Sequence, residues 1–246
     1  MTIFQTKPVV ISHRGANLLA PENTLPAFDL AYQMGAAWVE CDVVLTEDSV
    51  PVILHDRDLW RTARLHADID NLTYDALQNY NVGAYFAKAK IQATAPKLEA
   101  LLELALQYGR GVNIEIKPAL PEYAEATAEC AWKIMRPYLD RIPILVSSFE
   151  LEALLWYKQN APGVHLGYLM SSWQTDWKEK AMHLKITSIH CNEKILNPKR
   201  LSILTQSQYG ILAYTVNSIA RAEELFKAGV TGIFSDDPQL LSKAAS

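Results

Sequence analysis

The sequence contains few cysteines, and they are not arranged to cross-link the chain or to bind a metal. Its 246 residues include Cys41, Cys130 and Cys191, which are odd in number and far apart, with no Cys-x-x-Cys spacing. This pattern excludes a disulfide framework and a thiolate metal site. We therefore interpret all three as buried free thiols.

Long apolar runs and a surplus of basic residues are also missing. No run approaches the roughly 18 apolar residues of a membrane span, and the first residues lack the basic start and apolar core of a signal peptide. Lysine and arginine number 23 against 27 aspartate and glutamate, a net charge of −4, so no electrostatic footprint for nucleic acid or an anionic membrane is present. We expect a cytoplasmic protein that acts on a small molecule and has no stable membrane association.

The segment 38–56 predicts a β-hairpin. Apolar and polar residues alternate with a period of two, break at a polar turn, and run apolar again to a His-Asp pair. If Asp48-Ser49 is the two-residue turn, Asp42 lies opposite His55, within contact distance across the strands. Glu40 shares a face with Asp42. The hairpin would thus bring two carboxylates and an imidazole together, as half of a metal-assisted acid/base site.

Strand and helix patterns alternate along the chain, of which half is hydrophobic. Strands are expected at 8–13, 37–42, 112–117, 142–147, 164–170, 186–192, 211–216 and 231–235. Helices are expected at 24–35, 97–108, 121–139, 150–159, 177–184, 198–208 and 219–228, and after Pro238. Eight strands, each followed by a helix, favour a (β/α)8 TIM barrel over an open sheet. We predict a single domain over 1–246, with 43–96 as an inserted hairpin and subdomain after the second strand.

Ionisable residues gather at the C-terminal ends of the expected strands, where such a barrel has its active site. They are His13 and Arg14 after the first strand, Glu40 and Asp42 on the second, and Glu115 and Lys117 on the third. Three buried carboxylates repel one another unless a cation lies between them, and Mg²⁺ or Ca²⁺ suits oxygen ligands. Salt bridges are the alternative, but only two basic residues are placed near the three acids.

The remaining polar groups favour phosphoryl transfer. Arg14 and Lys117 can hold an anion against the metal, and phosphate suits a guanidinium group. His13 and His55 would flank this centre. One imidazole would accept a proton from the attacking oxygen while the other donates one to the leaving oxygen.

Eight short motifs follow one another in order over nearly the whole chain. They are His13-Arg14-Gly15, Pro21-Glu22-Asn23-Thr24, Glu40-x-Asp42, Leu45-Thr46-x-Asp48-x-x-Pro51-Val52, His55-Asp56, Pro96-x-Leu98-Glu99, Glu115-x-Lys117 and Gly232-Ile233-x-x-Asp236-x-Pro238. This set resembles the glycerophosphodiester phosphodiesterases. The first block and the two acidic motifs are the specific ones.

The resemblance implies a phospholipase-C-like phosphodiesterase barrel. It implies metal-dependent hydrolysis of glycerophosphocholine or glycerophosphoethanolamine to sn-glycerol 3-phosphate and an alcohol, through attack of the glycerol 2-hydroxyl and a cyclic phosphate. The implied roles are metal ligation by Glu40, Asp42 and Glu115, acid/base catalysis by His13 and His55, phosphate binding by Arg14 and Lys117, and Glu22 near the metal or the glycerol hydroxyls.

The chain departs from the family pattern at two positions. Ser49 stands where the family often has a turn glycine, which puts the hairpin register in doubt by one residue. Tyr214 stands where the family usually has tryptophan, so the wall against the glycerol or the head group is expected to differ.

Several aromatic residues have a plainer interpretation beside a functional one. We interpret His66, His165 and His183 as core residues and Trp173 and Trp177 as a helix packing face, leave His190 open between core and pocket, and expect Tyr85 and Phe86 to cap the pocket. A phospholipase acting on membrane lipids or lysophospholipids would need an exposed apolar or basic rim, which the sequence does not show. A silent phosphate-binding protein would normally have lost an acid or a histidine, and none is missing.

Overall fold

The computed structural model describes residues 8–86, 92–237 and 240. The strands are β1 Val9–His13, β2 Trp38–Leu45, β3 Pro51–Ile53, β4 Gly111–Ile116, β5 Ile144–Ser148, β6 His165–Met170, β7 Ser188–Asn192, β8 Gly210–Tyr214 and β9 Gly232–Ser235. The α-helices are α1 Leu25–Gln33, α2 Trp60–Ala63, α3 Tyr74–Leu77, α4 Leu98–Tyr108, α5 Ala124–Met135, α6 Leu151–Asn160, α7 Trp177–Leu184, α8 Pro198–Thr205 and α9 Ile219–Lys227. Short 3₁₀ helices are η1 Ile69–Asn71, η2 Pro121–Tyr123, η3 Arg136–Tyr138 and η4 Glu193–Ile195.

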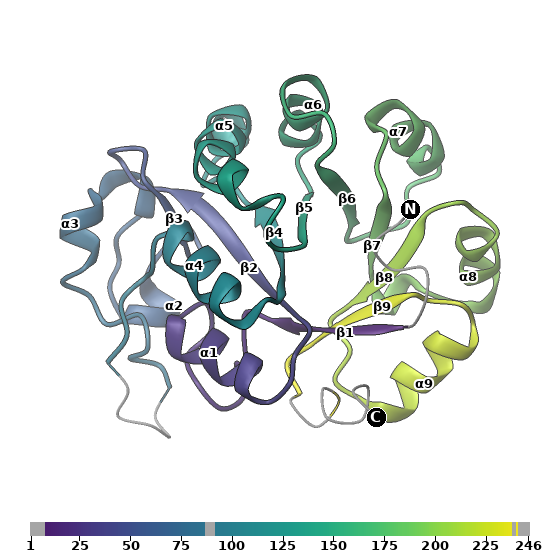
Figure 1. Ribbon diagram of the computed structural model, residues 1–246, viewed down its shortest axis with the longest axis horizontal. Coiled ribbons are helices and arrows are strands. Elements are labelled where there is room, and N and C mark those ends of the chain that lie inside the picture. Colours follow the sequence, from purple (N-terminus) through teal and green to yellow (C-terminus); the bar gives the residue numbers. More distant parts are fainter. Residues whose placement is uncertain (1–7, 87–91, 238–239, 241–246) are drawn as a thin grey trace.

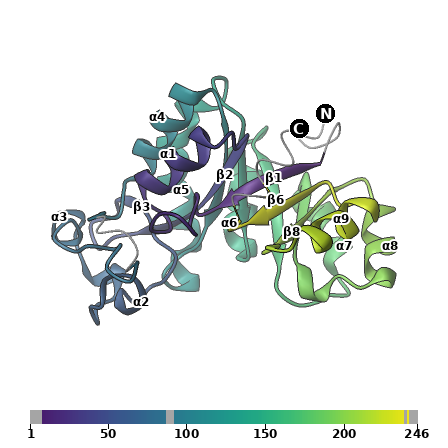
Figure 2. The same cartoon turned by 90° about the horizontal axis from the view of Figure 1, so that it is seen from below.

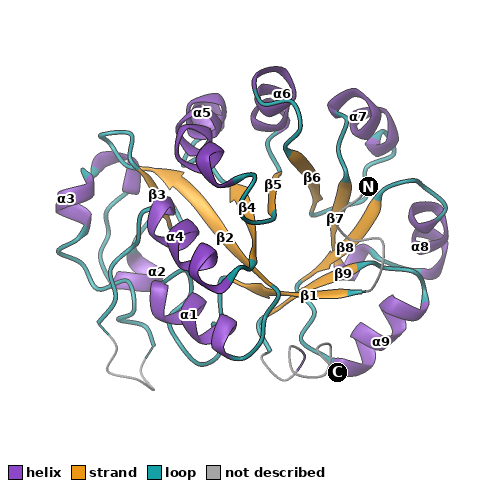
Figure 3. Ribbon diagram, in the orientation of Figure 1, coloured by secondary structure: helices purple, strands orange, loops and turns teal. Residues whose placement is uncertain are grey.

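All strands except β3 run parallel and close into a barrel. They follow the order β1, β2, β4, β5, β6, β7, β8, β9, and β9 pairs back onto β1, while β3 adds antiparallel to β2. The helices cover the outside of this ring of strands (Figures 1 and 3). The predicted (β/α)8 barrel is confirmed. The helix predicted after Pro238 falls mostly on residues that the structure does not describe.

The barrel strands are buried on both faces, which explains why their sequences are almost continuously apolar. Residues that face outward, such as Val39 and Ile114, join a large core beneath the helices. Residues that face inward, among them Ile11, Leu145 and Leu212, fill the barrel itself. Polar side chains that face inward lie nearer the C-terminal ends of the strands, so the mouth of the barrel at that end is polar.

A tight turn follows β1. Arg14 and Gly15 have φ angles of +55° and +79°, in the left-handed region. A Cβ atom on Gly15 would lie 2.6 Å from the backbone carbonyl carbon of Ala27 in α1, so only glycine fits. The Ala16 N–H donates to the Ala27 carbonyl oxygen (2.9 Å) and anchors the turn to that helix.

β2 and β3 form the predicted hairpin, but the predicted register is wrong by one residue. The strand pairing sets Asp42 opposite Leu54, whose N–H donates to the Asp42 carbonyl oxygen (3.0 Å), instead of opposite His55. Ser49 adopts a φ of +60°, so the turn is longer than two residues. The Thr46 N–H closes this longer turn with a hydrogen bond to the Val50 carbonyl oxygen. An extra residue in this conformation shifts the pairing of the two arms. His55 consequently lies in the loop that follows β3.

The described residues between β2 and α4, 46–86 and 92–97, which we call the insertion, form short elements at one end of the molecule (Figure 2). Leu59, Ile69 and Leu77 belong to a separate apolar cluster there. In this segment the N-cap Thr73 begins α3, and its hydroxyl oxygen accepts a hydrogen bond from the Ala76 N–H (3.3 Å).

Cys41 and Cys191 are buried free thiols as predicted, whereas Cys130 on α5 is only half-buried. A cysteine on the flank of a helix that covers a barrel can lie at the edge of the core, which the sequence pattern does not distinguish. No helix within the described ranges has the length and hydrophobicity needed to span a membrane.

Three histidines that were predicted to be core residues lie outside the core. His66 and His183 are exposed, and His165 is partly exposed. His66 stacks on Trp60 at the surface of the insertion, with ring centroids 4.4 Å apart. His66 and His183 lie on outer elements, and His165 begins β6, at the end of the barrel opposite the carboxylates.

Candidate active site

Three carboxylates meet at the mouth of the barrel. Glu40 and Asp42 are on β2, Glu115 is on β4, and the parallel register sets Asp42 beside Glu115. One carboxylate oxygen of each residue lies within 4.8 Å of the others, and all three residues are buried. The structure thus brings together the acids that the sequence predicted to meet.

Local hydrogen bonds and ion pairs hold this cluster. The Arg14 N–H donates to Glu40 Oε2 (3.0 Å), and Asn23 Nδ2 donates to Asp42 Oδ2 (2.8 Å). Arg14 Nε lies 3.2 Å and Lys117 Nζ 3.4 Å from the Asp42 oxygens. Burial works to raise the pKa of the Asp42 carboxyl, but the charges of Arg14 and Lys117 lower it below its usual range. Asp42 is therefore ionised at neutral pH.

The negative charges of the other two acids, Glu40 and Glu115, are less well compensated by neighbouring groups. Burial, followed by the charge of Asp42, raises the pKa of Glu115 to about 7 and that of Glu40 well above its usual value. Glu115 Oε1 is buried without a hydrogen-bond partner, and Lys117 Nζ at 3.7 Å is too distant to donate one. A hard cation would satisfy this oxygen and relieve the repulsion. The donor set therefore fits Mg²⁺ or Ca²⁺.

His13 ends β1 and is oriented by the barrel. Its Nδ1 lies 2.7 Å from Asp236 Oδ1, in the segment after β9. Asn17 Nδ2 donates to the same oxygen (2.6 Å), and Asn217 Nδ2 donates to Asp236 Oδ2 (2.7 Å). Burial works to raise the pKa of Asp236, but the hydrogen bonds from His13, Asn217 and Asn17 lower it to about 2.

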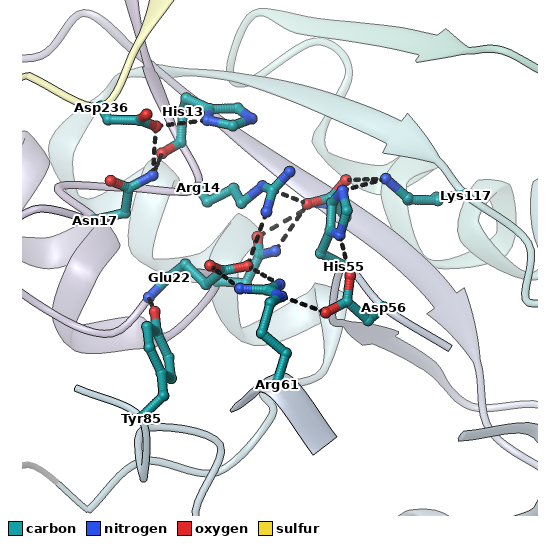
Figure 4. A network of polar contacts seen from close by, with 12 residues as sticks. His13, Arg14, Asn17, Glu22, His55, Asp56, Arg61, Tyr85, Lys117 and Asp236 are labelled. Carbon is teal, nitrogen blue, oxygen red and sulfur yellow. Dashed lines mark hydrogen bonds and ion pairs between the residues drawn. The ribbon is translucent and has the colours of Figure 1, made fainter. Parts of the chain in front are cut away.

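His55 has a similar arrangement, built from the insertion. Its Nδ1 lies 2.5 Å from Asp56 Oδ1, and Arg61 Nε donates to Asp56 Oδ2. Lys117 Nζ contacts the Nε2 atom of the same ring. Figure 4 shows both imidazoles at one site, with Arg14 between them in this view.

The carboxylate partners determine the tautomer of each ring. A carboxylate only accepts hydrogen bonds, so the Nδ1 atoms of His13 and His55 carry protons toward Asp236 and Asp56. In the neutral imidazole Nε2 then holds the lone pair. Nε2 is therefore the nitrogen of each ring that can exchange a proton with a bound molecule, and for His55 this requires that Lys117 Nζ, which contacts it here, moves away.

A cavity of about 420 Å³ contains these groups. His13, His55, Arg14, Lys117, Glu40 and Glu115 line it. Tyr214, at the end of β8, also lines it and packs edge-on against Phe149, with ring centroids 6.0 Å apart. The Tyr214 hydroxyl is buried without a hydrogen-bond partner.

Glu22 lines an adjoining cavity of about 530 Å³ with Tyr85 and Phe86. Both of its carboxylate oxygens are paired, with Arg14 Nη1 (2.9 Å) and with Arg61 Nη1 and Nη2 (2.6 and 2.7 Å). The Glu22 N–H donates to the Tyr85 hydroxyl (2.9 Å). The predicted substrate contact of Glu22 and the capping role of Tyr85 and Phe86 remain predictions.

The residues that orient the two imidazoles were not predicted from the sequence. Asp236 and Asp56 occur in the quoted motifs, so a signal existed for both, but only the fold shows which ring each one contacts. Asn217 and Arg61 carried no such signal, because neither occurs in a quoted motif and each meets its partner only in the folded chain.

His190 on β7 is packed in the core and also lines the cavity, so both of the alternatives left open for it describe its position. It is fully buried and its Nε2 lies 2.9 Å from Ser188 Oγ. A Cβ atom on Gly167 would lie 2.5 Å from this nitrogen, so glycine makes room for the ring. Trp177 on α7 is buried in the core, as predicted for a helix packing face, whereas Trp173 lies in the loop before that helix and packs against the core from there.

Replacing Asp236 by asparagine should lower kcat by about 100-fold, the usual size of a general acid/base contribution. An amide can donate to His13 Nδ1 and so favour the other tautomer, which places a proton on Nε2. The effect should fall on kcat more than on KM, because the cavity keeps its shape. An unchanged kcat, with Asp140→Asn at an exposed position as control, would contradict the orienting role.

His190 should make the folded state sensitive to acid. Burial lowers the pKa of His190 from its ordinary value of 6.5 to about 3. Between these values the unfolded chain binds the proton and the folded chain does not, so stability is complete above pH 6.5 and falls as the pH decreases. Near pH 5 the loss should reach about 2 kcal/mol. Urea unfolding at both pH values should show a weaker pH dependence in His190→Asn, and equal dependences would disprove the assignment.

Known proteins provide an independent comparison. A sequence model of the glycerophosphoryl diester phosphodiesterase family matches residues 13–240. A glycerophosphodiester phosphodiesterase of Caldanaerobacter subterraneus subsp. tengcongensis is 29% identical over 235 residues, covering 96% of each chain. One from Bacillus altitudinis is 30% identical over 233 residues, covering 93% of this chain and 94% of the relative.

A solved structure shows that the similarity includes the three-dimensional fold. An Oleispira antarctica phosphodiesterase, in complex with the product sn-glycerol-3-phosphate, matches with a TM-score of 0.92 and 34% identity, covering 97% of both chains. The match therefore includes the barrel and the insertion. The chain belongs to the glycerophosphoryl diester phosphodiesterase family and is a phosphodiesterase of the glycerophosphodiester class.

Proposed function

We propose that the protein hydrolyses glycerophosphodiesters, such as glycerophosphocholine and glycerophosphoethanolamine, to sn-glycerol 3-phosphate and an alcohol. The observation that carries this proposal is that two carboxylate-oriented imidazoles line the same cavity as a carboxylate cluster and two cationic side chains. The product bound to the Oleispira antarctica phosphodiesterase supports the same choice of substrate.

A divalent cation, Mg²⁺ or Ca²⁺, would be held by Glu40, Asp42 and Glu115, whose oxygens cluster within 4.8 Å of one another. When bound, it would supply stabilisation of the negative charge that grows on the phosphoryl oxygens. Arg14 and Lys117 would bind the same phosphoryl group, since both line the cavity beside the carboxylates. Tyr214 would form a wall for the glycerol or the head group, and Glu22 would hold Arg14 in position.

The proton transfers follow from the two imidazoles. In the first step the glycerol 2-hydroxyl oxygen forms a bond to phosphorus, its proton passes to Nε2 of one histidine, and the bond to the head-group oxygen breaks. Nε2 of the other histidine gives a proton to that leaving oxygen. Water then opens the cyclic phosphate with the two roles exchanged, so both rings return to their initial state. His13 and His55 serve as this pair because each has Nδ1 committed to a carboxylate.

We also propose that residues 1–246 act as one catalytic domain, with 43–96 as an inserted hairpin and subdomain. The separate apolar cluster of this segment supports that division. The cytoplasmic location and the absence of stable membrane association remain predictions.

The test is release of sn-glycerol 3-phosphate from glycerophosphocholine and glycerophosphoethanolamine, with and without a chelator. We expect release that stops on chelation and returns with Mg²⁺ or Ca²⁺. Activity that is indifferent to chelation would refute the metal role. Faster cleavage of phospholipid vesicles would favour a phospholipase, and thermal stabilisation by glycerol phosphate without turnover would favour a binding protein.

A further inference from the structure

Arg61, on the short helix α2 of the insertion, joins two acidic residues of the active site. Its Nε donates to Asp56 Oδ2 (2.5 Å), and its Nη1 and Nη2 donate to the two oxygens of Glu22 (2.6 and 2.7 Å). All three guanidinium nitrogens are therefore engaged at once, as Figure 4 shows. A fork-like pair of this kind fixes the direction of both carboxylates, which a single point charge would not do.

Asp56 uses its two oxygens for different partners. Oδ1 accepts from His55 Nδ1, and Oδ2 accepts from Arg61. Arg61 therefore fixes the orientation of the Asp56 carboxylate. The carboxylate in turn fixes the orientation of the His55 imidazole. Partial burial works to raise the pKa of Asp56, but the hydrogen bonds of His55 and Arg61 lower it well below its usual value, so it stays ionised.

The backbone alone does not position this imidazole. β3 ends at Ile53, and His55 lies in the loop beyond it, outside the ladder of paired strands. His13, by contrast, is the last residue of β1, and its partner Asp236 is held by Asn17 and Asn217. One catalytic histidine is thus oriented by the barrel and the other by the insertion.

Arg61 is also connected to Arg14 through Glu22. Glu22 accepts hydrogen bonds from both Nη atoms of Arg61. It accepts a further one from Arg14 Nη1 (2.9 Å). Arg14 in turn lies 3.2 Å from Asp42. One chain of contacts from the Nδ1 side of His55 to the carboxylate cluster therefore passes through the side chain of Arg61, while Lys117 connects Nε2 of the same ring to Asp42.

We propose that Arg61 is a positioning residue that couples the docking of the insertion to the orientation of His55, by holding Asp56 and Glu22 at the same time. It does not touch the reacting atoms and acts through its two carboxylate partners. The catalytic consequence rests on the proposed function, since it requires that His55 transfers a proton.

The experiment compares Arg61→Gln and Arg61→Lys with Arg57→Gln. Arg57 is a matched control, because it is another insertion arginine that is exposed to a similar degree, 39% against 43%, and forms a forked pair with Asp70. We expect Arg61→Gln to lower kcat about 10- to 100-fold with little change in KM, because a displacement of about 1 Å in a catalytic group can cost that much. Arg61→Lys should recover only part of kcat, and Arg57→Gln should stay within about two-fold of the wild type.

Chemical rescue separates loss of the guanidinium from misfolding. Methylguanidinium, added below denaturing concentrations, should raise kcat of Arg61→Ala, where the space of the side chain is open, and leave Arg57→Ala unchanged. The free cation can occupy the same position between Asp56 and Glu22. A melting temperature of Arg61→Gln close to that of Arg57→Gln is expected.

A readout without substrate keeps the test independent of the reaction. The NMR signal of the His55 Nδ1 proton, assigned by its loss in His55→Gln, should broaden or shift in Arg61→Gln and persist in Arg57→Gln. If the wild type cleaves no glycerophosphodiester, the proposed function fails, and this spectrum alone decides the role of Arg61. An unchanged His55 signal, or a kcat for Arg61→Gln equal to that of Arg57→Gln, would overturn the proposal.

Discussion

Replacing His13 or His55 by glutamine is expected to lower kcat for glycerophosphocholine at least about 100-fold, while KM changes little. Glutamine can keep a hydrogen bond to Asp236 or Asp56, but it cannot exchange a proton at the position of Nε2. Steady-state kinetics of both variants measure the effect. His183→Gln, an exposed histidine on α7 outside the cavity, is the control and should retain full activity.

A second substrate separates the roles of the two rings. Nitrophenolate leaves without needing a proton, so a nitrophenyl ester of glycerol phosphate does not require the general acid of the first step. The variant that lacks this acid should recover most of its activity with the ester, and the variant that lacks the base should not. If both variants keep near-full kcat with glycerophosphocholine, the assignment of His13 and His55 is wrong.

Replacing Glu115 by glutamine should have opposite effects on activity and on stability. Removal of one negative charge from the cluster relieves its repulsion with Glu40 and Asp42, so the variant in chelator should be at least as stable as the wild type. The loss of a ligand should reduce kcat about 100- to 1,000-fold. Buried acids that only formed salt bridges would give the reverse result, since removing one partner of a buried pair is destabilising.

Thermal unfolding provides the measurement. Saturating Mg²⁺ or Ca²⁺ at about 100 times Kd should stabilise the wild type by about 2.7 kcal/mol, which is about 5 to 10 °C for a chain of this size. Glu115→Gln should lose most of this shift. Glu129→Gln on α5, an exposed acid that pairs with Lys133 at 2.6 Å, should keep it. A wild type whose melting temperature does not respond to either ion would exclude the metal site.

The hairpin illustrates where sequence reasoning loses accuracy. The alternation of residues predicts both arms and places Glu40 and Asp42 on one face, and the structure agrees. The register depends instead on the conformation of one turn residue, Ser49, whose positive φ adds a residue to the turn. Alternation is the same for either register, so it could not reveal the error.

The orienting residues illustrate a second limit. Asp56 follows His55 directly in the sequence, yet nothing in that spacing shows that its other oxygen contacts Arg61. Asp236 lies 223 positions from His13 and meets it only because β9 closes the barrel against β1. Contacts of this kind depend on loop paths, which have no periodic signal.

The sequence by itself determined the alternating strands and helices, the apolar lining of the barrel, and the types of residue that end the strands. These features depend on local periodicity and on the rule that parallel strands deliver their C-terminal ends to one mouth. Only the tertiary structure decided which carboxylate orients which imidazole and how the insertion reaches His55. Such choices depend on side-chain directions across closed strands and irregular loops, where a shift of one residue changes every partner.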